Sequence, residues 1–186
     1  MRIIAGSLKG RTLSAPPGMS TRPTTDTVRE MIFSLLDHHV MWAGLRIMDL
    51  CCGSGALGFE ALSRGAAHCT FVDSSPAVMA LVQETADSFG LSERTTVVRS
   101  DVISFLRQCG PGSADVVFAD PPYADRLCTR IANGLLKLAI LTPGGIYVGE
   151  HGDREIILPS PEWTVLAHKE RGRTVVDVLR YEASLP

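Results

Sequence analysis

The sequence predicts an α/β fold, in which a seven-stranded, mostly parallel sheet carries helices on both faces and ends in an antiparallel hairpin. Two observations predict it. From residue 45 onward, short apolar runs alternate with segments of helical periodicity, and this order is typical of a parallel sheet. The last part of the chain instead holds two apolar runs around a short polar turn, with no helix between them.

Apolar spacing places each element of this sheet. Strands are expected at Leu45–Leu50, Cys69–Val72, Thr95–Arg99, Val116–Ala119, Ile146–Glu150, Trp163–Ala167 and Thr174–Tyr181. Helices are expected between them at Ala56–Arg64, Pro76–Phe89, Val102–Gln108 and Leu127–Leu138. Ser75 can cap the second of these helices with Pro76 at its first position, and Gly90 can end it.

Residues 1–22 are expected to form a small basic arm ahead of the main domain, which spans residues 23–186. A hairpin is predicted from Arg2–Ile4 and Arg11–Leu13. A turn-rich stretch follows at residues 15–20, and then a helix whose apolar residues recur at helical spacing from Val28 to Leu36.

Charge is unevenly distributed along the chain. Residues 1–30 carry five basic and two acidic residues, a net of +3, so the remainder carries −5 to give the total of −2. A basic arm on an acidic body is a footprint of nucleic-acid contact. The residues expected to contact RNA there are Lys9, Arg11, Arg22 and Arg29. For Arg22 and Arg29, a solvated helix face is the alternative.

Composition excludes several classes of protein. The chain has 186 residues, of which 45% are hydrophobic, enough for one domain with a buried core. It lacks the apolar run of about 18 residues that spans a bilayer, and its first residues do not read as a secretory signal, so a cytoplasmic location is expected. Its five cysteines form no C-x-x-C pair, which argues against a disulfide framework and a zinc site.

A glycine-rich turn follows the first strand of the expected sheet. Gly53, Gly55 and Gly58 form a G-x-G-x-x-G pattern, which lets the backbone approach a ligand closely at a helix N-terminus. The pattern alone fits NAD, FAD or S-adenosylmethionine. Asp49 precedes it at the strand end, where a carboxylate repels a pyrophosphate and tolerates a sulfonium ligand that carries an ammonium group.

Two further acids close the next two strands. Asp73 ends the second strand, where a carboxylate can accept hydrogen bonds from ribose hydroxyls. Asp101 ends the third, where it can accept one from an adenine amine. Three acids at successive strand ends would line one cleft and favour S-adenosylmethionine. Helix capping is the alternative role of Asp73 and Asp101.

A rigid loop follows the fourth strand. Asp120-Pro121-Pro122-Tyr123 places a carboxylate, a fixed carbonyl and an aromatic ring together, because two prolines force an extended backbone. Asp120 and the Pro121 carbonyl can accept from an exocyclic amine of a base, and Tyr123 can stack on its ring. This arrangement suits transfer of a methyl group to that amine without a metal.

This tetrapeptide matches the Asp/Asn/Ser-Pro-Pro-Tyr/Phe/Trp signature of amino-methyltransferases, and the rest of the chain resembles the RsmD family. The segments that carry the resemblance are residues 2–6, 9–11, 21–30 and 49–66. It runs from residue 1 to the C-terminal hairpin. The resemblance implies a Rossmann-like class I methyltransferase that uses S-adenosylmethionine to methylate N2 of one guanine in 16S rRNA, within a small-subunit or assembly particle.

The resemblance also assigns residues. The expected cofactor-binding set is Asp49, Cys51, Gly53, Gly55, Asp73, Ser74, Asp101 and Val102. Asp120, Pro121 and Tyr123 are expected to hold the guanine, with Pro122 beside the RNA. A membrane and a metal are not expected as partners.

Other functions stay open from the residues alone. An adenine-N6 or cytosine-N4 DNA methyltransferase would share the tetrapeptide, although 186 residues leave little room for a target-recognition domain. A NAD-dependent oxidoreductase would need neither Asp49 nor the loop at Asp120. A ribosome-assembly factor without catalysis would not need both Asp120 and Tyr123. Cytosine-C5 methylation is disfavoured because Cys109 lacks a preceding proline.

Overall fold

The computed structural model describes residues 1–14, 26–122, 126–157 and 160–182. These residues form one seven-stranded sheet with the order β3-β2-β1-β4-β5-β7-β6. The strands are β1 (Arg46–Leu50), β2 (His68–Asp73), β3 (Thr95–Arg99), β4 (Ala114–Ala119), β5 (Leu141–Gly152), β6 (Trp163–Arg171) and β7 (Thr174–Tyr181). The first five run parallel, and β7 pairs antiparallel with β5 and β6. The predicted fold class is confirmed.

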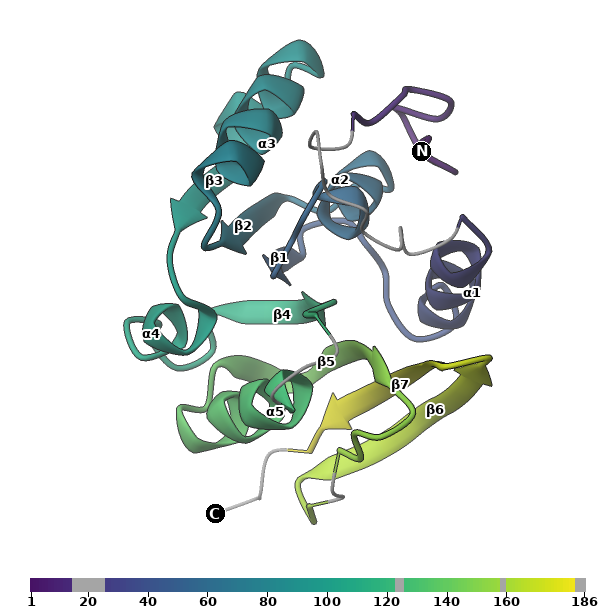
Figure 1. Cartoon of the computed structure of the whole chain (residues 1–186), viewed down its shortest axis with the longest axis vertical. Helices are drawn as coiled ribbons and strands as arrows, with labels where there is room; N and C mark the ends of the chain where they lie inside the picture. Colours follow the sequence, from purple (N-terminus) through teal and green to yellow (C-terminus); the bar gives the residue numbers. More distant parts are fainter. Residues whose placement is uncertain (15–25, 123–125, 158–159, 183–186) are drawn as a thin grey trace.

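Helices cover both faces of the sheet (Figure 1). One face packs against α1 (Asp26–Leu36), α2 (Ala56–Ser63) and α3 (Pro76–Ser88), in a core that includes Phe33, Phe59 and Phe71. The other packs against α4 (Val102–Leu106) and α5 (Leu127–Lys137), around residues such as Tyr147. A short 3-10 turn, η1 (Ser92–Arg94), leads into β3.

Four strands are longer than the apolar pattern indicates; β2 and β4 gain two residues each, and β5 and β6 extend farther. β5 begins at Leu141, although Pro143 and Gly144 predicted a turn there. Both residues are exposed at the start of the strand, and the pairing of β4 with β5 is irregular at this point, between Ala114 and Val116. β6 continues to Arg171, so the hairpin turn is shorter than expected and consists of residues 172–173.

The N-terminal hairpin is present as a pair of short antiparallel segments. Arg2 and Thr12 form an isolated bridge, and Ile3 N–H donates to the Arg11 carbonyl over 3.0 Å. The first segment runs along α2, because Ile4 N–H and Ala5 N–H both donate to the carboxylate of Glu60, at 2.7 and 3.0 Å. The arm is therefore part of the packed body.

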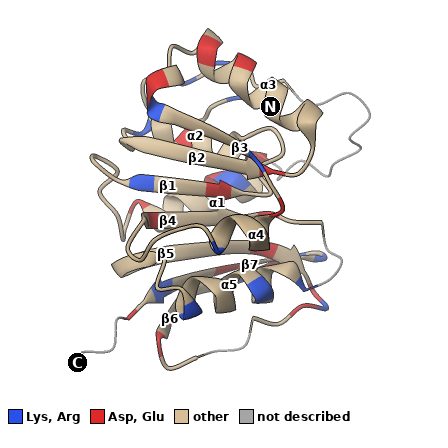
Figure 2. Cartoon of the chain, turned by 90° about the vertical axis from the view of Figure 1, so that its left-hand side faces the viewer, with Lys and Arg blue, Asp and Glu red and all other residues tan. Residues whose placement is uncertain are grey.

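The carboxyl ends of the parallel strands lie at one edge of the sheet. This edge faces the viewer in Figure 1 and lies on the right of Figure 2. Acidic and basic segments are interspersed over the ribbon rather than gathered on one face (Figure 2). Within the described part of the chain, the helices are all too short or too polar to cross a membrane.

Candidate active site

The glycine-rich turn after β1 has the backbone that its sequence predicts. Gly53 and Gly55 have φ values of 51° and 73°, in the left-handed region that glycine tolerates best. Gly55 lies so close to Phe59 that a Cβ would come within 2.9 Å of that ring, and a Cβ on Gly58 would come within 2.6 Å of Cys69 Sγ. A Cβ on Gly53 would meet nothing within 4 Å. Gly55 and Gly58 therefore serve packing, and Gly53 borders open space.

Asp49 holds this turn in place. Its side chain is 2% exposed, and Oδ2 accepts from the backbone N–H of Gly58 over 2.9 Å. Burial raises the pKa of Asp49, the bond from Gly58 opposes this, and the nearby carboxylates of Asp120 and Asp73 raise it further. The cofactor-binding role expected for Asp49 from its position stays a prediction. Asp49 anchors the loop to the start of α2.

Asp73 joins the ends of β2 and the glycine-rich turn. Its carboxylate accepts from Gly53 N–H over 3.3 Å and from Ser75 N–H over 2.9 Å. Ser75 is the N-cap of α3, as predicted, because its hydroxyl accepts from Val78 N–H. Asp73 is therefore free of the capping role, and it stays half-buried beside the exposed Ser74. Carboxylate oxygens hold more lone pairs than two bonds use, so a ribose can also donate to them.

Asp101 takes the alternative role that its sequence position allowed. It is the N-cap of α4, and Oδ1 accepts from Ser104 N–H over 2.9 Å. This bond lowers the pKa of Asp101 and keeps it charged. The side chain is exposed, so its second oxygen stays accessible to a ligand. Val102 is the first residue of α4, where backbone N–H groups lack intrahelical acceptors.

The pKa of Cys51 depends on the acidic side chains at this edge of the sheet. Its backbone is left-handed, with φ 56°, and burial raises the pKa of its thiol to about 12, with further contributions from four carboxylates. Those carboxylates belong to Asp73, Asp120, Asp49 and Asp101. The sheet register agrees with this, because Leu50 at the end of β1 pairs with Val72 of β2 and with Ala119 of β4. The acids that follow these strands therefore lie along one edge of the sheet, and their joint role in binding a cofactor stays a prediction.

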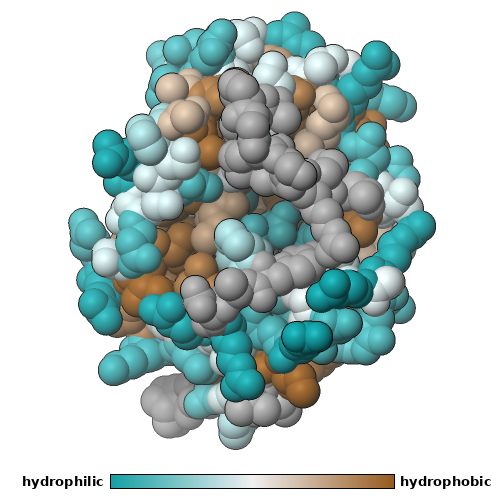
Figure 3. Space-filling view, viewed as in Figure 1, coloured by the Kyte–Doolittle hydropathy of each residue, from teal (hydrophilic) through white to brown (hydrophobic). Residues whose placement is uncertain are grey.

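The Asp120 loop begins at the centre of the same edge. Ala119 ends β4 and pairs with Leu50 of β1 on one side and with Gly149 of β5 on the other. Asp120 is half-buried, Pro121 is buried and Pro122 is exposed. Tyr123 lies outside the described residues. Figure 3 shows this edge as a surface that is hollowed near its centre.

The cations expected to contact RNA lie elsewhere. Arg29 is 0% exposed, and its guanidinium donates to the Arg2 carbonyl and to Asp26. Its Nε and Nη1 atoms are buried and have no hydrogen-bond partner among residues 1–14, 26–122, 126–157 and 160–182. Phosphate contact by Arg29 is wrong, because the side chain does not reach the surface. Arg22 lies outside the described residues.

Arg11 and Lys9 lie at the opposite edge of the sheet. Arg11 donates to the carbonyl of Ser88 at the end of α3 over 2.8 Å, and its guanidinium sits 4.8 Å from the centre of the Phe89 ring. The helices that follow parallel strands end at the strand-start edge, so this position is remote from Asp120. Arg11 therefore ties the arm to the body rather than to the catalytic edge, and Lys9 is exposed in the same turn.

The sequence did not indicate which groups of α2 hold the N-terminal arm. Every residue of α2 is buried, including Glu60, which receives two arm N–H groups and Arg64 Nε at 3.0 Å. Ser63 Oγ accepts from Leu8 N–H over 2.9 Å, and the Ser63 carbonyl accepts from Ser7 N–H over 2.8 Å. A single acid in an otherwise apolar helix is the signal that could have revealed this attachment.

A second unpredicted cluster holds the C-terminal hairpin. Asp177 of β7 accepts from His151 Nε2 over 2.8 Å and from His168 Nδ1 over 2.6 Å. His151 Nδ1 donates to the Gly152 carbonyl over 3.0 Å. His151 is thus the satisfied strand-end residue that its position suggested. The cluster lines a cavity of about 470 Å³, together with exposed Val165 and Ile156 among others.

Comparison with known families decides the relationship. A family model described as "Conserved hypothetical protein 95" matches residues 1–180. Ribosomal RNA small subunit methyltransferase D from Escherichia coli K12 is 35% identical over 185 residues, covering 98% of this chain and 91% of the relative. The chain belongs to the RsmD family.

A further relative and two solved structures match most of the chain, in sequence or in fold. Ribosomal RNA small subunit methyltransferase D from Haemophilus influenzae is 34% identical over 175 residues, covering 92% of this chain and 89% of the relative. The solved structure of yhhF from Escherichia coli superposes with a TM-score of 0.87 at 32% identity, and covers 99% of both chains. An RNA methyltransferase from Salinibacter ruber in complex with S-adenosyl-L-homocysteine shares the fold, with a TM-score of 0.65 at 16% identity over 88% of this chain and 96% of that one.

Proposed function

We propose that this RsmD-family chain transfers a methyl group from S-adenosylmethionine to the exocyclic N2 of a guanine in 16S rRNA. The position of the glycine-rich turn, Asp73 and the Asp120-Pro121-Pro122 loop at the adjacent ends of β1, β2 and β4 carries the proposal. The relatives named above, whose names state methylation of small-subunit rRNA, support the substrate.

The cofactor fits the residues at this edge. Open space at the Cβ position of Gly53 leaves room for a ligand against the backbone. Asp73 would accept from the ribose hydroxyls, and exposed Asp101 from the adenine amine, with the Val102 N–H beside it. Ser74 and Cys51 would also border the bound cofactor. The carboxylates of Asp73, Asp101 and Asp120 favour a ligand with positive charge and disfavour a pyrophosphate, which argues against NAD.

S-adenosylmethionine supplies an electrophilic methyl group when it is bound. Asp120 and the Pro121 carbonyl would accept the two N–H groups of the guanine amine and orient its nitrogen lone pair along the direction of attack. Consecutive prolines fix this carbonyl, because their rings restrict the backbone. Tyr123 would stack on the base, and Pro122 would border the entering RNA. Fixed acceptors need no reorganisation as the amine develops positive charge.

Replacement of Asp120 tests this proposal. Asp120→Ala should lose methyl transfer to small-subunit particles from cells that lack the enzyme by about 100-fold or more, because the lost bond strengthens as the reaction proceeds. Affinity for S-adenosylhomocysteine, measured by calorimetry, should stay near that of the wild type. Asp73→Ala is the matched variant on the cofactor side and should weaken that affinity by about 1.5–3 kcal/mol. An active Asp120→Ala enzyme refutes the proposed site.

A further inference from the structure

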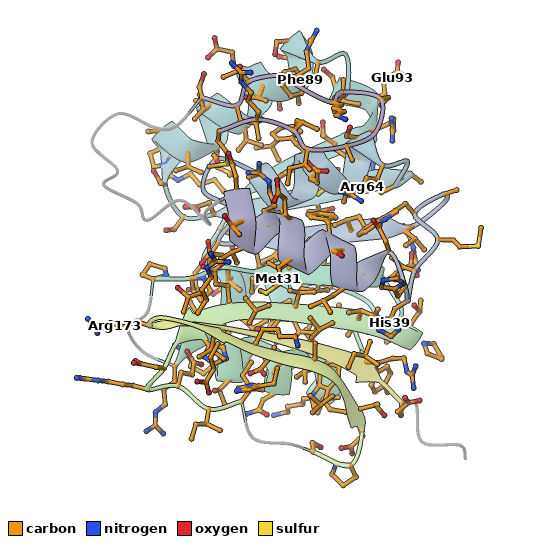
Figure 4. The ribbon with its side chains drawn as sticks, turned by 90° about the vertical axis from the view of Figure 1, so that its right-hand side faces the viewer. Met31, His39, Arg64, Phe89, Glu93 and Arg173 are labelled. Carbon is orange, nitrogen blue, oxygen red and sulfur yellow. The ribbon has the colours of Figure 1, made fainter. Side chains whose placement is uncertain are left out.

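Exposed cations gather at the tip of the C-terminal hairpin. Arg171 ends β6, Arg173 lies in the turn to β7, and Arg154 follows the end of β5. All three side chains are exposed, and Figure 4 shows Arg173 projecting away from the ribbon. Asp153 N–H donates to the Arg173 carbonyl over 3.2 Å, so Arg154 and the turn are neighbours. We call these three arginines the hairpin-tip cluster.

Within the described chain, the guanidinium groups of the hairpin-tip cluster are not engaged in polar contacts with other side chains. Across residues 1–14, 26–122, 126–157 and 160–182, none of the three guanidinium groups takes part in an ion pair or a side-chain hydrogen bond. Two acids lie near the cluster, exposed Asp153 beside Arg154 and Glu170, which pairs with His168 over 3.3 Å, so three arginines outnumber two carboxylates. Exposed cations held together without partners cost repulsion, and a polyanion relieves it.

The register of the sheet places this cluster beside the proposed catalytic loop. Ala119 pairs with Gly149, and Gly152, three residues farther along β5, pairs with Thr174 next to the turn. A rise of about 3.3 Å per residue and two strand spacings of about 4.8 Å put the turn on the order of 14 Å from Asp120. The cluster therefore lies on the same edge of the sheet as the loop, near enough for one RNA strand to pass over both.

We propose that the hairpin-tip cluster binds phosphates of the RNA strand that carries the target base. The proposal rests on the proposed function and moves the RNA-binding surface from the N-terminal arm to the C-terminal hairpin. Phosphate contacts position the strand and carry no sequence information. The cluster would hold the backbone while the loop at Asp120 holds the base.

Salt dependence of RNA binding tests this surface. We would compare Arg171→Gln/Arg173→Gln with Arg107→Gln/Lys137→Gln, using 16S rRNA transcribed in vitro. Arg107 and Lys137 are exposed where α4 and α5 end, at the opposite edge of the sheet. Each lost phosphate contact should flatten the slope of log affinity against log salt by about 0.7 and weaken binding about fivefold at 0.1 M salt. The hairpin pair should show both effects, and the control pair should show neither.

Separate readouts distinguish the possible failures. Unchanged affinity for S-adenosylhomocysteine shows that both double variants are folded. An unchanged slope in the hairpin pair, or an equal loss in the control pair, overturns the RNA surface whether or not the enzyme methylates rRNA. Weaker methyl transfer to the assembled particle with unchanged binding to free RNA also overturns it, since the arginines would then contact a protein of the particle. Failure of the wild type to methylate rRNA contradicts the proposed function, and the binding measurement still decides the surface.

Discussion

The N-terminal arm and the C-terminal hairpin are both rich in cations, yet their cations do different things. In the arm, Arg11 donates to the Ser88 carbonyl at the end of α3, and the Arg2 carbonyl accepts from buried Arg29 of α1. In the hairpin, Arg171 and Arg173 are exposed and unpaired within the described chain. The difference teaches that a basic segment can have its arginine engaged in packing, as Arg11 is, or exposed and available to a partner, as Arg171 and Arg173 are.

Each region is nevertheless fastened by one buried carboxylate. Glu60 receives two backbone N–H groups of the arm, whereas Asp177 receives two histidines that tie β7 to β5 and β6. The first attachment uses the backbone and the second uses titratable side chains. The two regions should therefore respond differently to mutation and to pH.

The largest effect is expected from the anchor of the arm. Glu60→Ala would leave the N–H groups of half-buried Ile4 and Ala5, and the guanidinium of Arg64, without their acceptor, which should lower the free energy of unfolding by about 3 kcal/mol. Glu84→Ala, at an exposed position of α3, should change it by less than about 0.5 kcal/mol. Denaturant unfolding measures both. Equal stability of the two variants would show that Glu60 does not hold the arm.

Two glycines of the arm allow a closer test of its packing. Gly6 and Gly10 have nearly equal φ values, 81° and 84°, but a Cβ on Gly6 would come within 1.9 Å of the Ser63 carbonyl oxygen, whereas one on Gly10 would meet nothing within 4 Å. Backbone strain in the two alanine variants is therefore matched. Gly6→Ala should be less stable than Gly10→Ala by about 2 kcal/mol, because only it must displace α2. Equal melting temperatures would mean that the arm is loosely attached.

Single arginine substitutions should separate the roles of the two regions. Arg11→Gln should lose about 1 kcal/mol of stability, since it gives up a hydrogen bond and a contact with the Phe89 ring, while the salt slope of RNA binding stays unchanged. Arg173→Gln should show the reverse. A flattened salt slope in Arg11→Gln would return the RNA-binding role to the arm.

The smallest effect is expected from pH. Burial alone lowers the pKa of His151, but its bonds to Asp177 and Gly152 raise it overall, and the bond to Asp177 raises the pKa of His168. A histidine pKa above its unfolded value means that this stabilisation is complete below about pH 6.5 and is lost as pH rises through the folded pKa. The bonds from both histidines outweigh burial and lower the pKa of Asp177, so its contribution is lost only in acid.

The melting temperature of the wild type should therefore fall relative to that of His168→Gln as the pH rises above about 6.5. The comparison between the two proteins cancels the titration of every other group. If the difference in melting temperature between the two proteins stays constant across this pH range, the histidine cluster does not contribute pH-dependent stability.

Much of the site followed from the sequence because strand ends fix positions. The alternation of strands and helices predicts a parallel sheet. Asp73, Asp101 and Asp120 each follow a strand of that sheet, so they are expected at the same edge. Helix starts were also well marked, as with Ser75 and Pro76.

Tertiary contacts account for what the sequence did not show. Nothing in the local pattern around Arg29 indicates that this face of α1 is covered, and its contact with the Arg2 carbonyl comes from a segment 27 residues away in the chain. The partners of Glu60 lie more than 50 residues away in the chain. Asp49 carries the right charge at the right strand end, yet its bond to Gly58 turns it inward. These contacts cannot be predicted from charge and residue spacing alone.

The most direct test of the account is the identity of the methylated nucleoside. The protein would be incubated with isotope-labelled S-adenosylmethionine and small-subunit particles from cells that lack the enzyme, and the rRNA would be digested and analysed by mass spectrometry. The account predicts label in N2-methylguanosine of 16S rRNA, with at least a 100-fold loss in Asp120→Ala. Label in N6-methyladenosine or N4-methylcytidine, or no label in rRNA, would contradict it.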